Sequence, residues 1–111
     1  MREPVIGRRA LLAGSASALA AMPAAAQPTA TITIDHEAFA PATLAVAPGT
    51  AVTWDNKDHE PHNVVSAEEP RAFRSPLMDT GERFAFTFAQ AGIYRYFCAL
   101  HPHMVGVVVV A

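Results

Sequence analysis

The chain has 111 residues, of which 51% are hydrophobic and 16% are charged, with 9 Pro, 6 Gly and a single Cys. This length and composition are typical of one small globular domain and leave no room for a second. The formal charge is −2, and the 8 Lys and Arg residues are scattered, so the chain has no basic surface that would make nucleic acid a partner. One cysteine cannot close an intrachain disulfide, which leaves Cys98 as a thiol, a thiolate ligand or half of an intermolecular bridge.

Residues 1–26 have the pattern of a cleaved export signal. Arg8 and Arg9 precede an apolar, alanine-rich run that ends in three alanines before Gln27. The arginine pair favours the twin-arginine route, with general secretion as the alternative. A retained membrane anchor is the weaker interpretation because the run is short and Pro23 interrupts its end. We therefore expect a signal peptide at residues 1–26 and, at residues 27–111, a soluble periplasmic domain of net charge −4 without a membrane span.

The segment after Gln27 alternates between apolar and polar residues, which is typical of strands. Alternation predicts short strands at residues 31–34, 44–46 and 52–54, and further strands at 83–88, 93–98 and 105–110. Residues 67–80 contain two prolines and several charges and should form a loop or an edge. No segment after Gln27 has a helical period, so the pattern predicts an all-β domain, a small β-sandwich or barrel.

Three aromatic residues, Phe84, Phe86 and Phe88, fall on one face of the predicted strand 83–88. Such a stripe is far more often core than a binding surface, so we predict that it packs in the core.

Three potential metal ligands lie close together between the last two predicted strands. Cys98, His101 and Met104 follow one another at three-residue intervals. Strand geometry would point them apart, and Pro102 disfavours helical backbone at His101, so the segment should be an open loop that curls around one point. His62, in a distant segment at the start of another strand, is the best candidate for a fourth ligand.

Each of these residues also has an ordinary structural interpretation. A buried cysteine is usually a small apolar residue, and Met104 alone would be core. A free thiol in an exported protein is exposed to oxidation, however, and here it is accompanied by imidazole and thioether groups, the partners of soft metals. Two imidazoles, a thiolate and a weak thioether fit copper better than zinc or a hard cation. The ligand set therefore predicts one copper ion that alternates between Cu(I) and Cu(II), and hence electron transfer.

Other functions fit the sequence less well. Five histidines in total are too few for a multicopper oxidase. A nucleophilic pair of Cys98 with a histidine would lack an orienting acid and an oxyanion hole nearby, so we do not expect an enzyme. A protein that stores or delivers copper is the main alternative. His103 is interpreted as a surface residue or a competing ligand, and His36 and His59 as ordinary solvent-facing histidines.

The sequence resembles the cupredoxins, the small blue copper proteins, and within them the amicyanin and plastocyanin group. The resemblance is carried by Pro48–Asn56, Pro61–Val64, Phe39–Pro41 and the segment Gly92–Met104, whose short Cys-x-x-His-Pro-x-Met loop is similar to that of amicyanins. It implies a Greek-key sandwich of two sheets with about seven or eight strands.

The resemblance also implies a function and the residues that perform it. The copper ligands of the family fall on His62, Cys98, His101 and Met104, with Asn63 beside them. The implied protein is a monomeric periplasmic electron carrier. Its redox partners would be a quinoprotein dehydrogenase and a c-type cytochrome. The loop departs from amicyanins at His103, where they tend to carry an apolar aromatic residue.

Overall fold

The structure is a computed structural model that describes residues 27–111, so the predicted signal peptide lies outside the described residues. The described chain forms eight strands and no helix, which confirms the all-β prediction. The strands are β1 (Thr29–Asp35), β2 (Ala38–Ala40), β3 (Thr43–Val46), β4 (Thr50–Asn56), β5 (Val65–Ser66), β6 (Arg83–Phe88), β7 (Gly92–Phe97) and β8 (Val105–Val110). Within this part of the chain, no helix is long and apolar enough to cross a membrane.

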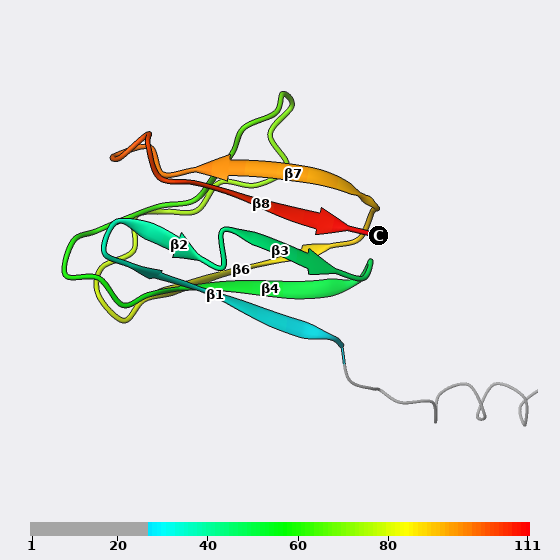
Figure 1. The fold of residues 1–111 in the computed structure, drawn as a ribbon, viewed down its shortest axis with the longest axis horizontal. Coiled ribbons are helices and arrows are strands. Elements are labelled where there is room, and N and C mark those ends of the chain that lie inside the picture. The colour runs from blue at the N-terminus through cyan, green and yellow to red at the C-terminus, as the bar shows by residue number, and fades with distance from the viewer. Residues whose placement is uncertain (1–26) are drawn as a thin grey trace, which may run out of the picture.

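The strands form two four-stranded sheets, ordered β2-β1-β4-β6 and β3-β8-β7-β5. The chain repeatedly crosses between the sheets, so that β1 pairs in parallel with β4 and β3 pairs in parallel with β8. Figure 1 shows the strands running along the long axis of the domain, with the β7–β8 loop at the end opposite the C-terminus. This arrangement confirms the predicted Greek-key sandwich.

The core lies between the sheets and follows directly from the alternation in the sequence. In β1, Ile32 and Ile34 are fully buried, because alternate side chains of a strand point to the same face. Trp54 in β4 is also fully buried and lies at the centre of an aromatic cluster, with its ring centroid 5.4 Å from those of both Phe73 and Tyr96. Fully burying one such apolar side chain contributes on the order of 2 kcal/mol.

The aromatic stripe of β6 packs in this core, as predicted. Phe88 is buried, and Phe84 and Phe86 are half-buried against the same cluster. Phe73 and Met78, from the irregular segment 67–80, are also buried there. That segment is a loop with two isolated β-bridges, and it closes one side of the core.

Two positions in the fold require glycine, one for its backbone conformation and one for the space it leaves. Gly49, in the turn before β4, has a φ of 92°, a conformation that residues with a side chain rarely adopt. Gly106 in β8 pairs with Tyr96 in β7, and a Cβ atom at Gly106 would overlap the Tyr96 phenol. The missing side chain of Gly106 therefore makes the space in which Tyr96 packs, two residues before Cys98.

Candidate metal centre

The β7–β8 loop, residues 98–104, is closed by its own backbone. The Cys98 amide donates to the Met104 carbonyl at 3.2 Å, and the Met104 amide donates to the His101 carbonyl at 2.8 Å. These two hydrogen bonds turn the chain back on itself between two strands that are already paired. The three residues that the sequence spaced at intervals of three are thereby held in one tight turn, as the open-loop prediction required.

His62 reaches the same place from the segment between β4 and β5. It forms an isolated antiparallel bridge with Met78, in which each backbone amide donates to the carbonyl of the other residue, at 3.1 and 2.8 Å. Its side chain is fully buried. The loop 67–80 therefore fixes the position of His62 through backbone pairing.

Three donor atoms converge at this end of the sandwich. The Cys98 Sγ atom lies 3.7 Å from Nδ1 of His62 and 3.9 Å from Nδ1 of His101. All three donor atoms lie within 4.8 Å of one another. A metal with bonds of about 2.0–2.3 Å to nitrogen and sulfur would separate such donors by roughly 3.6–3.8 Å. The sulfur–nitrogen distances fit a shared metal ion.

Met104 closes the same loop, where its backbone carbonyl accepts a hydrogen bond from the Cys98 amide. It is 2% exposed and belongs to the same buried cluster as Cys98. A thioether in this surrounding is a weak, soft donor that water does not reach. The donor set available here is thus one thiolate, two imidazoles and a thioether, which suits copper. A hard cation would prefer carboxylate ligands, and this set contains none.

Asp58 orients the His62 ring. Its Oδ2 atom lies 2.9 Å from His62 Nε2, and both side chains are buried. The same carboxylate accepts hydrogen bonds from the amides of Glu37 and His59, at 3.0 and 2.8 Å. The hydrogen bond from His62, followed by that of the Glu37 amide, lowers the pKa of Asp58 to about 2. An ionised Asp58 keeps the proton of His62 on Nε2 and leaves the Nδ1 lone pair free to face Cys98.

Asn63 connects the two segments that carry the donors. Its Oδ1 atom accepts a hydrogen bond of 2.8 Å from the Ala99 amide, immediately after Cys98. The side chain is buried, so this bond is not exchanged with water. The sequence resemblance placed Asn63 beside the first histidine and the cysteine, and the structure confirms this.

The outer edge of the group is formed by His101, whose side chain is 23% exposed. Its Nε2 atom lies 3.3 Å from the Glu60 carboxylate, on the side away from Cys98. The His103 side chain is 66% exposed and pairs with Glu37, so the structure supports its interpretation as a surface residue. His36 and His59 are exposed, as expected.

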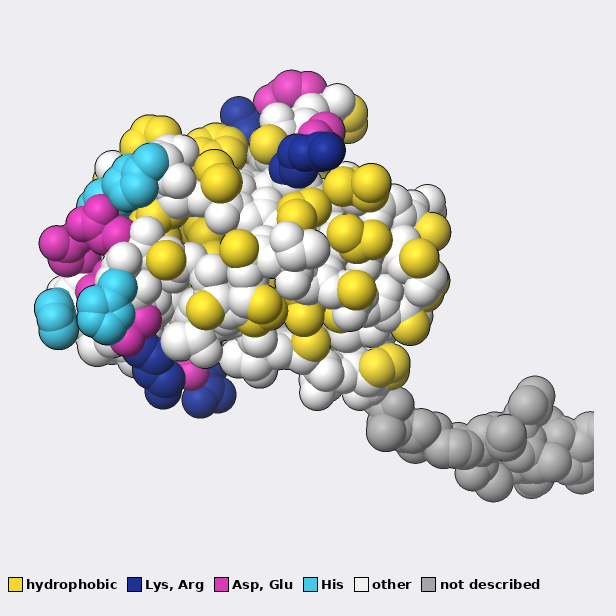
Figure 2. All heavy atoms as spheres, in the orientation of Figure 1, with side chains coloured by type: hydrophobic (Ala, Val, Ile, Leu, Met, Phe, Trp, Pro, Cys, Tyr) yellow, Lys and Arg dark blue, Asp and Glu magenta, His cyan; other side chains and the backbone are white. Residues whose placement is uncertain are grey.

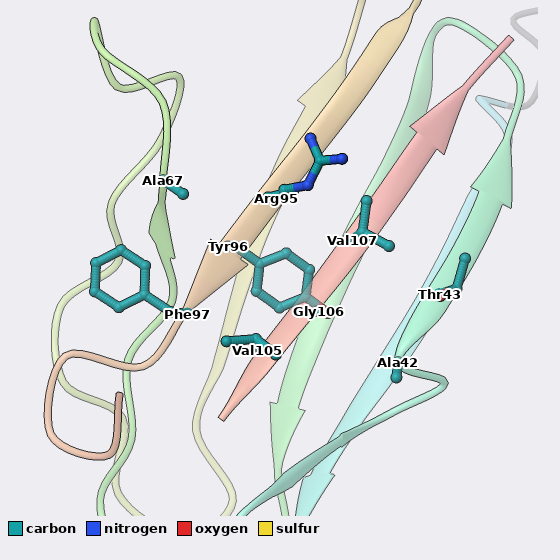
Figure 3. Close-up of a pocket in the computed structure, with 9 residues that line it drawn as sticks. All are labelled: Ala42, Thr43, Ala67, Arg95, Tyr96, Phe97, Val105, Gly106 and Val107. Carbon is teal, nitrogen blue, oxygen red and sulfur yellow. The ribbon is translucent and has the colours of Figure 1, made fainter. Parts of the chain in front are cut away.

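A separate apolar groove of about 500 Å³ crosses the outer face of β7 and β8 (Figure 3). Arg95, Val105 and Val107 are among the residues that line it. It contains none of the four predicted ligands, and its only charged side chain is that of Arg95. The groove therefore offers no donor set for a metal.

An all-β sandwich of two sheets, with a buried thiolate and two imidazoles gathered at one end, defines the cupredoxin class of protein. A family model described as copper binding proteins, plastocyanin/azurin family, matches residues 26–111. The chain belongs to this family, and its cofactor is one copper ion.

Individual proteins similar to this chain belong to the same class. The amicyanin of Paracoccus denitrificans is 40% identical over 70 residues, covering 60% of this chain and 53% of that protein, so the chain spans about half the length of this relative. Amicyanin-alpha of Methylorubrum extorquens is 32% identical over 104 residues, covering 91% of this chain and 85% of the relative. Among solved structures, a purple cupredoxin from Nitrosopumilus maritimus is 36% identical with a TM-score of 0.70, covering 74% of this chain and 99% of the other.

Proposed function

We propose that this protein is a blue copper electron carrier in which His62, Cys98, His101 and Met104 hold the metal. The observation that carries this proposal is the convergence of Cys98 Sγ with two imidazole Nδ1 atoms, at 3.7 and 3.9 Å, inside a buried end of the sandwich. Copper bound there would supply a one-electron couple between Cu(I) and Cu(II).

The surrounding residues suit a site that changes charge without changing shape. The Asn63–Ala99 hydrogen bond ties the His62 segment to the Cys98 loop. The Asp58 carboxylate fixes the His62 ring, and the Met78 bridge fixes its backbone. Because these donor residues are held in place, the coordination geometry of the copper would change little when an electron arrives or leaves.

Burial favours a carrier over an enzyme. Cys98 and His62 are fully buried, and His101 provides the exposed edge of the group. A substrate molecule would have no access to the thiolate, whereas an electron can pass through the His101 ring. Leu100, which is 49% exposed, lies next to His101 in the loop and would contact a docked redox protein.

We further propose that residues 1–26 direct export, by the twin-arginine route, and that residues 27–111 act in the periplasm as a monomer. The similarity to amicyanins supports a quinoprotein dehydrogenase as electron donor and a c-type cytochrome as acceptor. The negative charge of the domain would steer a basic partner, an effect that salt should weaken.

The test is repeated voltammetric cycling of the copper-loaded protein in the presence of a Cu(I) chelator. An electron carrier should keep its copper through many cycles in both oxidation states. Rapid transfer of copper to the chelator would contradict electron transfer and favour storage or delivery. The variant His36→Gln removes an exposed imidazole outside the group and should retain copper as the parent does, whereas His62→Gln should lose it.

A further inference from the structure

The β1–β2 turn lies at the same end of the domain as the β7–β8 loop (Figure 1), in a backbone conformation that residues with side chains rarely adopt. Asp35 pairs with Ala38, so His36 and Glu37 alone make the connection, and their φ angles are 52° and 54°. A two-residue turn with both φ angles positive favours Asn-Gly or a similar pair, because a Cβ atom is crowded there. Such strain persists where the surrounding structure requires it, and it clusters at functional segments. Since the His36 side chain is 90% exposed, Glu37 is the residue whose side chain should explain the strain.

Glu37 reaches the surroundings of both imidazole donors. Its backbone amide donates a hydrogen bond of 3.0 Å to Asp58 Oδ2, the atom that lies 2.9 Å from His62 Nε2. In its carboxylate, Oε2 lies 3.9 Å from His101 Nε2, and Oε1 lies 3.2 Å from His103 Nε2. Figure 2 shows histidine and acidic side chains gathered together at one end of the molecule. One residue of the turn is therefore connected to both imidazoles, by its backbone on one side and by its side chain on the other.

The two imidazoles have the same arrangement of neighbours. Each has its Nδ1 atom toward the thiolate sulfur and its Nε2 atom toward a carboxylate. His62 faces the buried Asp58, whereas the Nε2 atom of His101 is shared by Glu37 and by Glu60, whose Oε1 atom is at 3.3 Å. Carboxylates behind ligating imidazoles orient the rings and make them more basic ligands. Because Glu60 shares this nitrogen, loss of Glu37 would still leave His101 facing a carboxylate.

We propose that Glu37 is a positioning residue of the copper site, where its amide supports the carboxylate behind His62 and its own carboxylate acts on His101. This inference rests on the proposed function, because it assigns Glu37 to the copper site described there. The negative charge of Glu37 favours Cu(II), the more positive state of the metal, and so lowers the reduction potential. Glu37→Gly would relieve the strain and still donate the amide to Asp58, but it would remove this charge. The need for the charge explains why a side chain occupies this strained position.

The test is voltammetry of the copper-loaded protein, with variants that separate charge from strain. Glu37→Gln and Glu37→Gly should both keep the copper and raise the reduction potential. Because the Glu37 carboxylate is 40% exposed and screened by water, the expected rise is about threefold in the Cu(I)/Cu(II) ratio at a fixed solution potential, or roughly 28 mV. His36→Gly relieves the same kind of strain and retains the carboxylate, and Glu68→Gln removes an exposed charge of the 67–80 loop. Both of these controls should keep the potential of the parent protein.

Urea unfolding of the apoproteins tests the strain itself. Glu37→Gly and His36→Gly should each unfold at a urea concentration equal to or above that of the parent, because glycine adopts a positive φ without a steric penalty. A lower midpoint in both variants would overturn the claim that the turn is strained.

Two results would overturn the role of Glu37. These are a potential in Glu37→Gln equal to that of the parent, and an equal rise in Glu68→Gln. A readout without copper is the nitrogen chemical shifts of the His101 ring in the apoprotein, which should change in Glu37→Gln and stay constant in Glu68→Gln. If the protein failed to bind copper, the proposed function would fail. Constant His101 shifts in Glu37→Gln would separately overturn the action of Glu37 on His101.

Discussion

Asp58 holds the ring of the proposed ligand His62 through a hydrogen bond of 2.9 Å, and its replacement tests how the residues behind the ligands support copper binding. Its carboxylate accepts three N–H groups, from His62 Nε2, the Glu37 amide and the His59 amide. An asparagine has one acceptor oxygen, so Asp58→Asn must place its NH₂ against at least one of these donors. In one orientation the amide faces the His59 N–H. In the other it can donate to His62 Nε2 only if the histidine proton moves to Nδ1, the atom that faces Cys98.

The expected magnitude follows from these contacts. A hydrogen bond to a charged group contributes about 1.5–3 kcal/mol, and loss of a carboxylate behind a ligating histidine typically weakens metal binding by about 10–100-fold. We therefore expect Asp58→Asn to weaken copper binding by about 10–100-fold, or roughly 1.4–2.7 kcal/mol. The apoprotein should also lose stability, because buried donors are left unpaired.

Copper affinity is measured by competition with a chromophoric chelator, and stability by urea unfolding of the apoprotein. The matched control is Asp55→Asn, since Asp55 is also a buried aspartate but pairs with Lys57 and Arg83 at 3.3 and 3.6 Å instead of a ligand. Asp55→Asn should leave copper affinity within about twofold of the parent value. Equal copper affinities for the parent, Asp55→Asn and Asp58→Asn would refute the role assigned to Asp58.

Four further predictions concern residues around the site. Gly106→Ala should lower the free energy of unfolding by about 1–3 kcal/mol, because the new methyl group overlaps the Tyr96 phenol; an unchanged urea midpoint would contradict this. Met104→Gln should lower the reduction potential measured by voltammetry, because an amide oxygen favours Cu(II); a constant potential would mean that Met104 is only a core residue. Burial raises the pKa of Tyr96 to about 12, so the folded state keeps a proton that the unfolded state loses near pH 10. Stability should therefore fall between pH 10 and 12, by up to about 3 kcal/mol, and Tyr96→Phe should remove this part of the pH dependence in denaturant titrations; the same slope in both proteins would show that Tyr96 is not its source. Leu100→Glu should keep the visible spectrum but slow electron exchange with a redox partner about tenfold in stopped-flow measurements, and an unchanged rate would place the docking surface elsewhere.

The longer strands could be predicted because half-buried strands leave a period of two in the sequence. Ile32 and Ile34 show this, and so does the stripe that ends at Phe88. The strand β2, with 3 residues, was not predicted because it is too short for alternation to be visible. The strand expected to start at His62 is the two-residue β5, which begins only at Val65, and His62 itself lies before it in an isolated bridge. The order of the strands is a long-range property that periodicity does not contain, and the expected Greek-key order came from the family resemblance.

The part of the site that lies within one loop could be predicted from the sequence, and the part that depends on contacts between distant segments could not. Cys98, His101 and Met104 lie within one loop, so their spacing was sufficient to predict that they meet. The backbone pairing of His62 with Met78 joins two irregular segments and left no local pattern. The role of Asp58 was missed for a similar reason. It precedes His62 by four residues, but in a loop this spacing does not determine where a side chain points. The pairing of His103 with Glu37 likewise depends on how the β1–β2 turn approaches the copper loop.

Cys98 and two histidines are proposed to form a blue copper site. The most direct measurement is the visible spectrum of the purified protein after addition of one equivalent of Cu²⁺. A short copper–thiolate bond should give an intense blue charge-transfer band, and Cys98→Ala should abolish the band while the protein stays folded by circular dichroism. A pale complex in the parent protein, or a blue band that survives in Cys98→Ala, would contradict the assignment.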